Sequence, residues 1–346
     1  MSELRWDPLK ASWVIISNKE GRRPADFIRE RQQIHTSVCP FCYGQEGKTP
    51  PEVFAIRGKD SVENGQGWKV RVIPNKYPAL RIEGNLDKRG VGLYDAMNGI
   101  GAHEVVIENP DHDRSMAEFS TEEIVDVLTA WRSRLLDLRK DPRFRYILAF
   151  RNHGIEAGAP IPHPHSQIIA LPVTPPMRAT ELSTCRKYFE RKERCLVCDI
   201  LTQEREDGRR IVSDDGNYLV FAPFASRFPF ELNLLPWRHS HDFTLLADND
   251  LADLAKTLKD TLLRLHQVLH DPPYNLALHN SPPMHLRLGK PSYWGSIPYD
   301  YHWHIEIVPR LGAGAGFELG TGLHMNPAPP EIAARFLREA DPLLFR

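Results

Sequence analysis

Residues 163–167 read His-Pro-His-Ser-Gln and follow Tyr146–Phe150, an apolar run with the composition of a β-strand. Residues i and i+2 of an extended strand point to the same face, so His163, His165 and Gln167 are expected to share one face. A metal ion can hold one imidazole while the other stays free to attack phosphorus, and the neutral amide can bond a phosphate oxygen. A pair of core or surface histidines is the alternative for an isolated motif of this kind.

The second half of the chain repeats the order of motifs found in the first half. Each half contains, in sequence, a C-x-x-C pair, a glutamate eight residues before a lone histidine, a Tyr-to-Asn segment with a spacing of six, and an H-x-H motif. The members are Cys39/Cys42, Glu104/His112, Tyr146/Asn152 and His163/His165 in the first half, and Cys195/Cys198, Glu231/His239, Tyr274/Asn280 and His302/His304 in the second. Recurrence in one order indicates tandem duplication of a supersecondary unit.

The patterns predict an α+β protein with two domains. Its 346 residues suffice for two cores of ordinary size. Residues 1–175 are expected to form the first domain and residues 176–346 the second, each with an antiparallel sheet and one long helix. Strands are expected at 68–72, 104–108 and 146–150.

Local patterns predict the remaining elements. A capping box followed by a 3.6-residue apolar period predicts a helix over 120–138, and a row of leucines predicts its counterpart over 250–269. The charged segment 176–207 between the copies is expected to be largely helical. The Pro- and Gly-rich stretch 281–299 is expected to be a loop, and the chain is expected to end in a helix that reaches residue 344.

Composition argues against several classes of partner. A hydrophobic content of 41% with 26% charged residues is typical of a soluble globular protein. A net charge of −1 and a pI near 7.0 give no electrostatic case for nucleic acid or an acidic membrane. No apolar run approaches the about 20 residues of a membrane span, and the N-terminus lacks the apolar core of a signal peptide. Four of the five cysteines form two pairs, which favours thiolate ligands in a reducing cytoplasm.

The recurring motifs favour two metal sites, each with two thiolates and two imidazoles. The first set comprises Cys39, Cys42, His112 and His163, and the second comprises Cys195, Cys198, His239 and His302. This donor set suits zinc, with one ion expected in each set and iron as the alternative at one of them. Four protein ligands close a metal site, so neither ion is expected to hold a reactive water. A redox pair is the other meaning of C-x-x-C, but it normally opens a helix in a βαβ setting, which this sequence does not show.

A metal bound to His163 would fix the chain around His165 and leave that ring free and oriented, as a nucleophile requires. In the second copy His304 takes the same place, but Glu306 replaces the glutamine. A carboxylate there would repel a phosphate, so no second reaction centre is expected. His304 would then help to line the substrate pocket or have a structural role.

With these motifs the chain resembles the galactose-1-phosphate uridylyltransferase family of histidine-triad-like nucleotidyltransferases. The shared segments are Asp7-Pro8, Trp13–Ser17, Arg22–Pro24, Cys39–Cys42, Pro74–Leu80, Pro110–His112, Asn152, His163–Gln167 and Ala315–Gly322. They extend over nearly the whole chain. The resemblance implies that each copy is a histidine-triad-like unit and that the protein is a homodimer.

The resemblance also implies a ping-pong exchange between UDP-glucose and a hexose 1-phosphate, a reaction of galactose metabolism. The family histidine that matches His165 attacks the α-phosphorus of the nucleotide sugar, releases sugar 1-phosphate, and carries the nucleotidyl group to a second sugar 1-phosphate. Gln167 matches the glutamine that contacts the transferred phosphoryl group. Phe317 falls in a segment that reaches into the site of the partner subunit. The matching nucleotide-contacting positions are Arg23, Asn75 and Asn152.

Two departures separate the chain from the better-known members of the family. Pro160 stands where they have a small polar residue, so a hydroxyl contact to the sugar phosphate is missing. Cys195 and Cys198 make the chain similar to a branch that includes ADP-glucose phosphorylase-like enzymes. The alternative function is therefore an ADP-glucose phosphorylase or a dinucleoside polyphosphate phosphorylase, with orthophosphate as the acceptor. A non-enzymatic zinc scaffold is a third hypothesis, which His165 and Gln167 disfavour.

Overall fold

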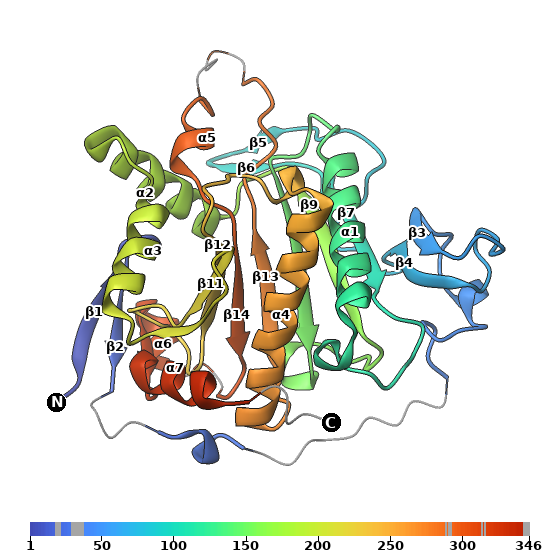
Figure 1. The fold of residues 1–346 in the computed structure, drawn as a ribbon. Coiled ribbons are helices and arrows are strands. Elements are labelled where there is room, and N and C mark those ends of the chain that lie inside the picture. Colours follow the sequence, from blue (N-terminus) through green and yellow to red (C-terminus); the bar gives the residue numbers. More distant parts are fainter. Residues whose placement is uncertain are drawn as a thin grey trace.

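One ten-stranded sheet runs through the molecule, and helices pack against both of its faces (Figure 1). The computed structural model describes residues 1–17, 22–28, 38–287, 289, 293–312, 314 and 316–341. Strands and helices together make an α+β fold, which confirms the predicted class.

The two halves of the sheet have the same internal order. From the centre outward, one half contains β8 (Tyr146–His153), β9 (His165–Leu171), β7 (Ala102–Ile107), β4 (Trp68–Pro74) and β3 (Phe54–Arg57). The other half contains β13 (Tyr274–His279), β14 (His304–Pro309), β12 (Leu232–Pro236), β11 (Tyr218–Phe221) and β10 (Ile211–Asp214). Strands β8 and β13 pair antiparallel at the centre. The matching order supports the interpretation of a duplication, and the two copies share one continuous sheet.

The two long helices lie side by side on one face of the sheet (Figure 1). They are α1 (Thr121–Leu138) and α4 (Asp248–Leu269). Their apolar faces, which include Trp131 and Leu254, join one buried cluster that extends across both halves. Since this face has one core for both halves, the division into two domains at residue 175 remains a prediction.

The opposite face of the second half is covered by α2 (Pro176–Lys192), α3 (Leu196–Asp207) and the hairpin of β1 (Glu3–Asp7) and β2 (Ser12–Ile16). Leu9, in the turn of that hairpin, packs in the same cluster as residues of α3 and β11. The smaller strands are β5 (Arg89–Val91), β6 (Tyr94–Ala96) and β15 (His324–Asn326), and the smaller helices are α5 (Ile297–Asp300), α6 (Gly316–Thr321) and α7 (Pro330–Glu339). Short 3-10 helices are η1 (Pro24–Asp26), η2 (Glu46–Lys48), η3 (Met116–Glu118), η4 (Ile155–Ala157) and η5 (Phe243–Leu245).

Most of the predicted elements are confirmed. The strands expected at 68–72, 104–108 and 146–150 are β4, β7 and β8, and the segment 176–207 forms α2 and α3. Helix α1 begins after Ser120, whose hydroxyl accepts from the backbone N–H of Glu123 at 3.2 Å, as a capping box requires.

Two element predictions were partly wrong. The C-terminal helix ends at Glu339, because Pro342 disfavours the helical conformation of the residue before it; residues 342–346 lie outside the described part. The expected loop over 281–299 is irregular in its described residues until Ile297, where the short helix α5 begins.

The placement of His163 and His302 on strands was also wrong. Strand β9 begins at His165 and β14 begins at His304, so each preceding histidine lies in the turn before its strand. Strand alternation therefore does not set the direction of the first ring in either H-x-H motif.

Candidate active site and metal-binding groups

His165 begins β9, and its ring is held against the segment before it. Its Nδ1 atom lies 2.8 Å from the carbonyl oxygen of His163, so Nδ1–H donates and Nε2 keeps its lone pair. The residue is 8% exposed, and burial lowers the pKa of the ring, which favours the neutral imidazole. Phe41 packs edge-on against the ring, with 5.5 Å between the ring centroids. The ring is thus oriented, with an unprotonated Nε2.

A cavity of about 480 Å³ opens beside His165 and is lined by residues of both halves. Asn152 of β8 lines it, and its Oδ1 accepts from Nδ2 of Asn275 of β13 at 2.8 Å. Arg151 also lines it, but this guanidinium is paired with Glu108 at 2.9 Å. The remaining lining residues are His112–Ser115, Glu118, His153–Glu156, Ala159, Ile161–Pro164, His266 and Asp271. The cavity is polar and has the size of a small-molecule site.

Gln167 lies on β9 two residues beyond His165, and its amide is bonded to His103 of β7. His103 Nε2 is 2.8 Å from Gln167 Oε1, while the backbone N–H of Ala79 donates to His103 Nδ1 at 3.2 Å. Asn75 is adjacent, with its Nδ2 atom 3.2 Å from His103 Nε2. The structure thus brings Gln167 and Asn75 together, and the residue between them is a histidine to which the sequence assigned no function.

Two other predicted contact residues lie apart from this group. Arg23 is the exposed residue before η1, and Phe317 is on α6 and 39% exposed. Neither residue lines the cavity beside His165, and Gln167, Asn75 and His103 are not among its lining residues either.

The first predicted metal set comes together as expected. The ligand atoms of Cys39, Cys42, His112 and His163 lie within 4.8 Å of one another. Cys42 Sγ is 3.3 Å from His112 Nδ1 and 3.6 Å from His163 Nδ1, and the two Nδ1 atoms are 3.3 Å apart. Zn–S bonds of about 2.3 Å and Zn–N bonds of about 2.0 Å in a tetrahedron require separations of about 3.3–3.8 Å. His163 Nε2 lies 2.8 Å from the carbonyl oxygen of Asn109, an arrangement typical of a metal-bound imidazole.

The second predicted set has the same geometry. Cys195, Cys198, His239 and His302 also place their ligand atoms within 4.8 Å. Cys198 Sγ lies 3.4 Å from His239 Nδ1 and 3.6 Å from His302 Nδ1. His239 Nε2 lies 3.0 Å from the carbonyl oxygen of Pro298. Both sets can therefore hold a tetrahedral ion.

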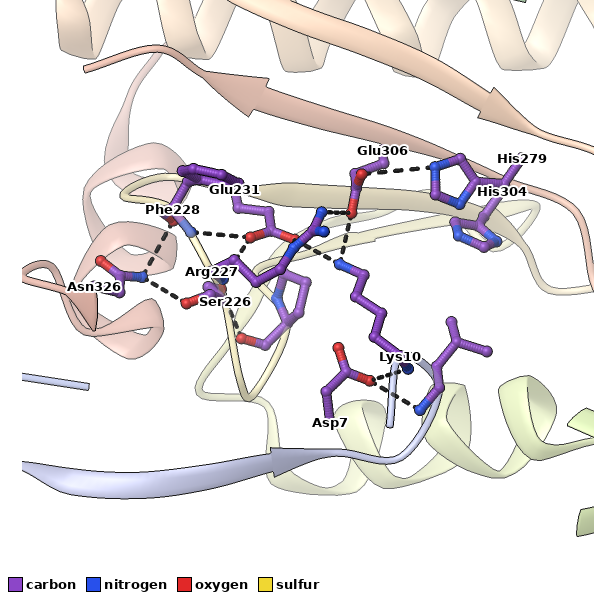
Figure 2. Close-up of polar contacts among 12 residues, drawn as sticks. Asp7, Lys10, Ser226, Arg227, Phe228, Glu231, His279, His304, Glu306 and Asn326 are labelled. Carbon is purple, nitrogen blue, oxygen red and sulfur yellow. Dashed lines mark hydrogen bonds and ion pairs between the residues drawn. The ribbon is translucent and has the colours of Figure 1, made fainter. Parts of the chain in front are cut away.

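In the second half a cavity of about 580 Å³ lies beside His304, and Lys10 of the N-terminal hairpin is among its lining residues. Lys10 reaches Glu306, the residue that replaces glutamine, and Glu231 (Figure 2). Lys10 Nζ lies 2.6 Å from Glu306 Oε1 and 2.7 Å from Glu231 Oε1, and Arg227 reaches Glu306 at 2.8 Å. Burial alone would raise the pKa of Glu306, but these two cations hold that pKa well below its usual range. The carboxylate that replaces glutamine is thus paired inside the protein.

The structure also corrects one correspondence of the sequence repeat. Glu104 faces α1 and forms a bidentate ion pair with Arg134, whereas Glu231 faces the opposite side of the sheet. Since β7 pairs with β9 and β12 with β14 in equivalent registers, the residue in the place of Glu231 is His103 rather than Glu104. The equal spacing of Glu104 to His112 and of Glu231 to His239 in the sequence therefore pairs residues that differ by one position in the structure.

A third group of ligand atoms was not anticipated from the sequence. Glu181 of α2, His279 of β13 and His304 of β14 are buried and lie within 4.8 Å of one another. Glu181 Oε1 is 3.3 Å from His304 Nε2 and 3.5 Å from His279 Nδ1. Burial, and after it the neighbouring His279, lowers the pKa of His304 to about 3. Two neutral imidazoles and a carboxylate can hold a transition metal. The only sequence signal at Glu181 is its position three residues after Arg178 in a helix. That spacing indicates an ion pair rather than a metal ligand.

The chain matches a family of nucleotidyltransferases. The chain belongs to the galactose-1-phosphate uridyl transferase family: the model of the N-terminal domain matches residues 51–175, and the model of the C-terminal domain matches residues 181–311. The predicted family is therefore confirmed.

Relatives with two activities match nearly the whole chain. It is 36% identical to an ADP-glucose phosphorylase of Arabidopsis thaliana, over 97% of this chain and 92% of that protein. It is 29% identical to a galactose-1-phosphate uridylyltransferase of Thermotoga maritima, over 99% of both proteins. A crystal structure of an Arabidopsis thaliana ADP-glucose phosphorylase with bound ADP-glucose has 34% identity and a TM-score of 0.81, over 99% of both chains. Among the described residues no helix is long and apolar enough to cross a membrane.

Proposed function

We propose that the protein transfers a nucleoside monophosphate from a nucleotide sugar to a phosphate-bearing acceptor through a nucleotidyl group on His165. The observation that carries this proposal is the hydrogen bond from His165 Nδ1 to the carbonyl oxygen of His163, which leaves the Nε2 lone pair beside the cavity. Covalent catalysis requires an oriented, neutral nucleophile of this kind.

The step balances without a further reactant. Nε2 of His165 attacks the α-phosphorus, an N–P bond forms, and the P–O bond to the β-phosphate breaks as sugar 1-phosphate leaves with the electron pair. In the second half-reaction an oxygen of the acceptor phosphate attacks phosphorus and the N–P bond breaks. Gln167 would donate an N–H to the transferred phosphoryl group, and the residues proposed to contact the substrate are Arg23, Asn75, Asn152 and, in the partner subunit of a homodimer, Phe317.

The two Cys₂His₂ sets would hold one zinc ion each, with iron as an alternative at one of them. Four protein ligands leave no position for substrate, so each metal would fix the segment that carries its ligands. In the first set this segment includes His163, whose carbonyl group orients His165. The proposed role of this metal is therefore to support the nucleophile.

For donor and acceptor we favour ADP-glucose and orthophosphate, a phosphorylase reaction. This choice is supported by the 36% sequence identity to the Arabidopsis thaliana phosphorylase and by the second cysteine pair. Exchange between UDP-glucose and a hexose 1-phosphate is the second candidate, supported by the family and by the Thermotoga maritima relative. A cytoplasmic homodimer remains the expected form of the protein.

Intact-mass measurement after mixing the protein with ADP-glucose or UDP-glucose tests the proposal. We expect a mass increase of one adenylyl group with ADP-glucose and no increase in a His165→Ala variant. Addition of orthophosphate should discharge the adduct as nucleoside diphosphate. A uridylyl adduct that is discharged by hexose 1-phosphate alone would favour the second candidate, and the absence of any adduct would reject nucleotidyl transfer through histidine.

A further inference from the structure

His103 and Gln167 lie on neighbouring strands and face the same side of the sheet. His103 of β7 stands opposite Ile169 of β9, which makes Gln167 its diagonal neighbour. The next residue, Glu104, points to the other face and pairs with helix α1. Alternation along β7 therefore directs His103 to the face that carries His165.

The contacts of His103 determine which of its ring nitrogens carries the proton. The backbone N–H of Ala79 donates to Nδ1 at 3.2 Å, so Nδ1 is the acceptor and the neutral ring carries its proton on Nε2. Nε2–H then donates to Oε1 of Gln167 at 2.8 Å. Because a proton occupies Nε2, the adjacent Nδ2 of Asn75 cannot donate to this atom and is left for another acceptor.

We propose that His103 is a positioning residue that fixes the orientation of the Gln167 amide. With Oε1 held by His103, the two N–H groups of Gln167 must point the other way and are available to oxygens of a transferred phosphoryl group. The amide of a free glutamine could rotate and present its oxygen, which would repel the phosphoryl oxygens. This inference rests on the proposed nucleotidyl transfer and extends it to a residue that does not touch the substrate.

The second half of the protein has different residues at the positions that correspond to His103 and Gln167. In the strand registers Glu231 occupies the position of His103, and Glu306 occupies the position of Gln167. Both carboxylates bind Lys10, so these two positions carry negative charges paired with a cation in place of a histidine and an amide (Figure 2). The first half therefore differs from the second in having a histidine–glutamine pair at these positions rather than two carboxylates paired with a lysine.

Two conservative variants separate the two contacts of the ring. In His103→Asn the amide oxygen can replace Nδ1 as the acceptor for Ala79, but the side chain is too short to reach Gln167. In His103→Gln the amide N–H can replace Nε2–H as the donor to Gln167. We expect His103→Asn to slow adduct formation by about threefold to tenfold, the span of one net hydrogen bond, and His103→Gln to keep most of the rate. In a Gln167→Ala background, His103→Asn should have no further effect.

The outcomes distinguish this inference from the proposed function. Equal slowing by both His103 variants, or an undiminished effect of His103→Asn in the Gln167→Ala background, would overturn the positioning role. Long-range ¹H–¹⁵N spectra of the imidazole report its tautomer independently of turnover. A ring protonated on Nδ1 would refute the inference even in an active enzyme. If the wild-type protein forms no adduct, the proposed nucleotidyl transfer is wrong. An Nε2–H tautomer in that protein would still establish the contact between His103 and Gln167, but without a catalytic role.

Discussion

The Nδ1 atom of His165 lies 2.8 Å from the main-chain oxygen of His163, which joins the proposed nucleophile to a residue of the first Cys₂His₂ set. The bond uses the carbonyl group of His163 and leaves the ring of that residue for the metal set. One residue can therefore serve both functions at once. The orientation of the His165 ring then depends on how firmly the turn before β9, which contains His163, is held in place.

The first prediction concerns the nucleophile itself. His165→Ala should abolish adduct formation and slow turnover by several orders of magnitude, since a covalent intermediate can no longer form. Metal content should be unchanged, because the His165 ring is not among the four ligands of the first set. Intact-mass and elemental analysis would check both results. Residual adduct in this variant would place the nucleophile at another residue.

The second prediction concerns the first metal set. Cys42→Ser should lower metal content by about one ion per chain and lower the free energy of unfolding by several kcal/mol, because binding to a structural site contributes directly to folding. Cys185→Ala is the matched control: Cys185 is buried but belongs to neither set, so metal content should be unchanged. Protein purified without chelators that contains no zinc or iron would contradict the assignment of both sets.

The two metal sets could be predicted because their evidence is chemical and local. Cysteine pairs, lone histidines and H-x-H motifs recur with their spacings in both halves, and few functions other than metal binding use such a combination. The α+β class and both long helices also follow from local periodicity. The periodicity is visible within short windows of sequence, and the metal sets follow from short motifs that recur in the same order in both halves.

The features that could not be predicted depend on strand register and on packing between distant segments. The contact between His103 and Gln167 requires β7 to pair with β9 in one particular register. Glu181 reaches two histidines only because α2 covers the second half of the sheet. The pairing of Lys10 with Glu306 joins residues 296 positions apart.

The third prediction concerns the pairing of Lys10 with Glu231 and Glu306 in the second half. Lys10→Met removes one of the cations that pair with Glu231 and Glu306, and loss of one partner of a buried ion pair costs about 3–5 kcal/mol. Lys10→Arg retains the charge and should cost less. Adding Glu306→Gln to Lys10→Met should recover part of the loss. Chemical denaturation would measure all four proteins, and an unchanged stability of Lys10→Met would contradict the pairing.

The fourth prediction is the pH dependence of that loss. The pKa of folded Glu306 is depressed, so its contribution to stability is present above the unfolded pKa of about 4.3 and is lost as pH falls through the folded pKa. In Lys10→Met the ionised Glu306 has one cation fewer, so protonation of this carboxylate at low pH costs the variant less stability than it costs the wild type. The gap between the stability curves of wild type and variant should therefore be constant near neutral pH and narrow as pH falls below about 4.3 towards the folded pKa of Glu306. A gap that does not narrow as pH falls from about 4.3 towards the folded pKa would show that the effect is not electrostatic.

The last prediction concerns Gln167, whose amide can donate to phosphate oxygens but cannot act as a base for water. Gln167→Ala should slow both half-reactions by about tenfold to a thousandfold, the span of one lost transition-state donor. Gln167→His should convert part of the transfer into hydrolysis, because a titratable ring would then stand beside the nucleotidyl group. Rapid-quench measurement of adduct formation and discharge separates these effects. Unchanged rates of both half-reactions in Gln167→Ala would show that the side chain does not contact the phosphoryl group, and the orientation assigned through His103 would then have no catalytic consequence.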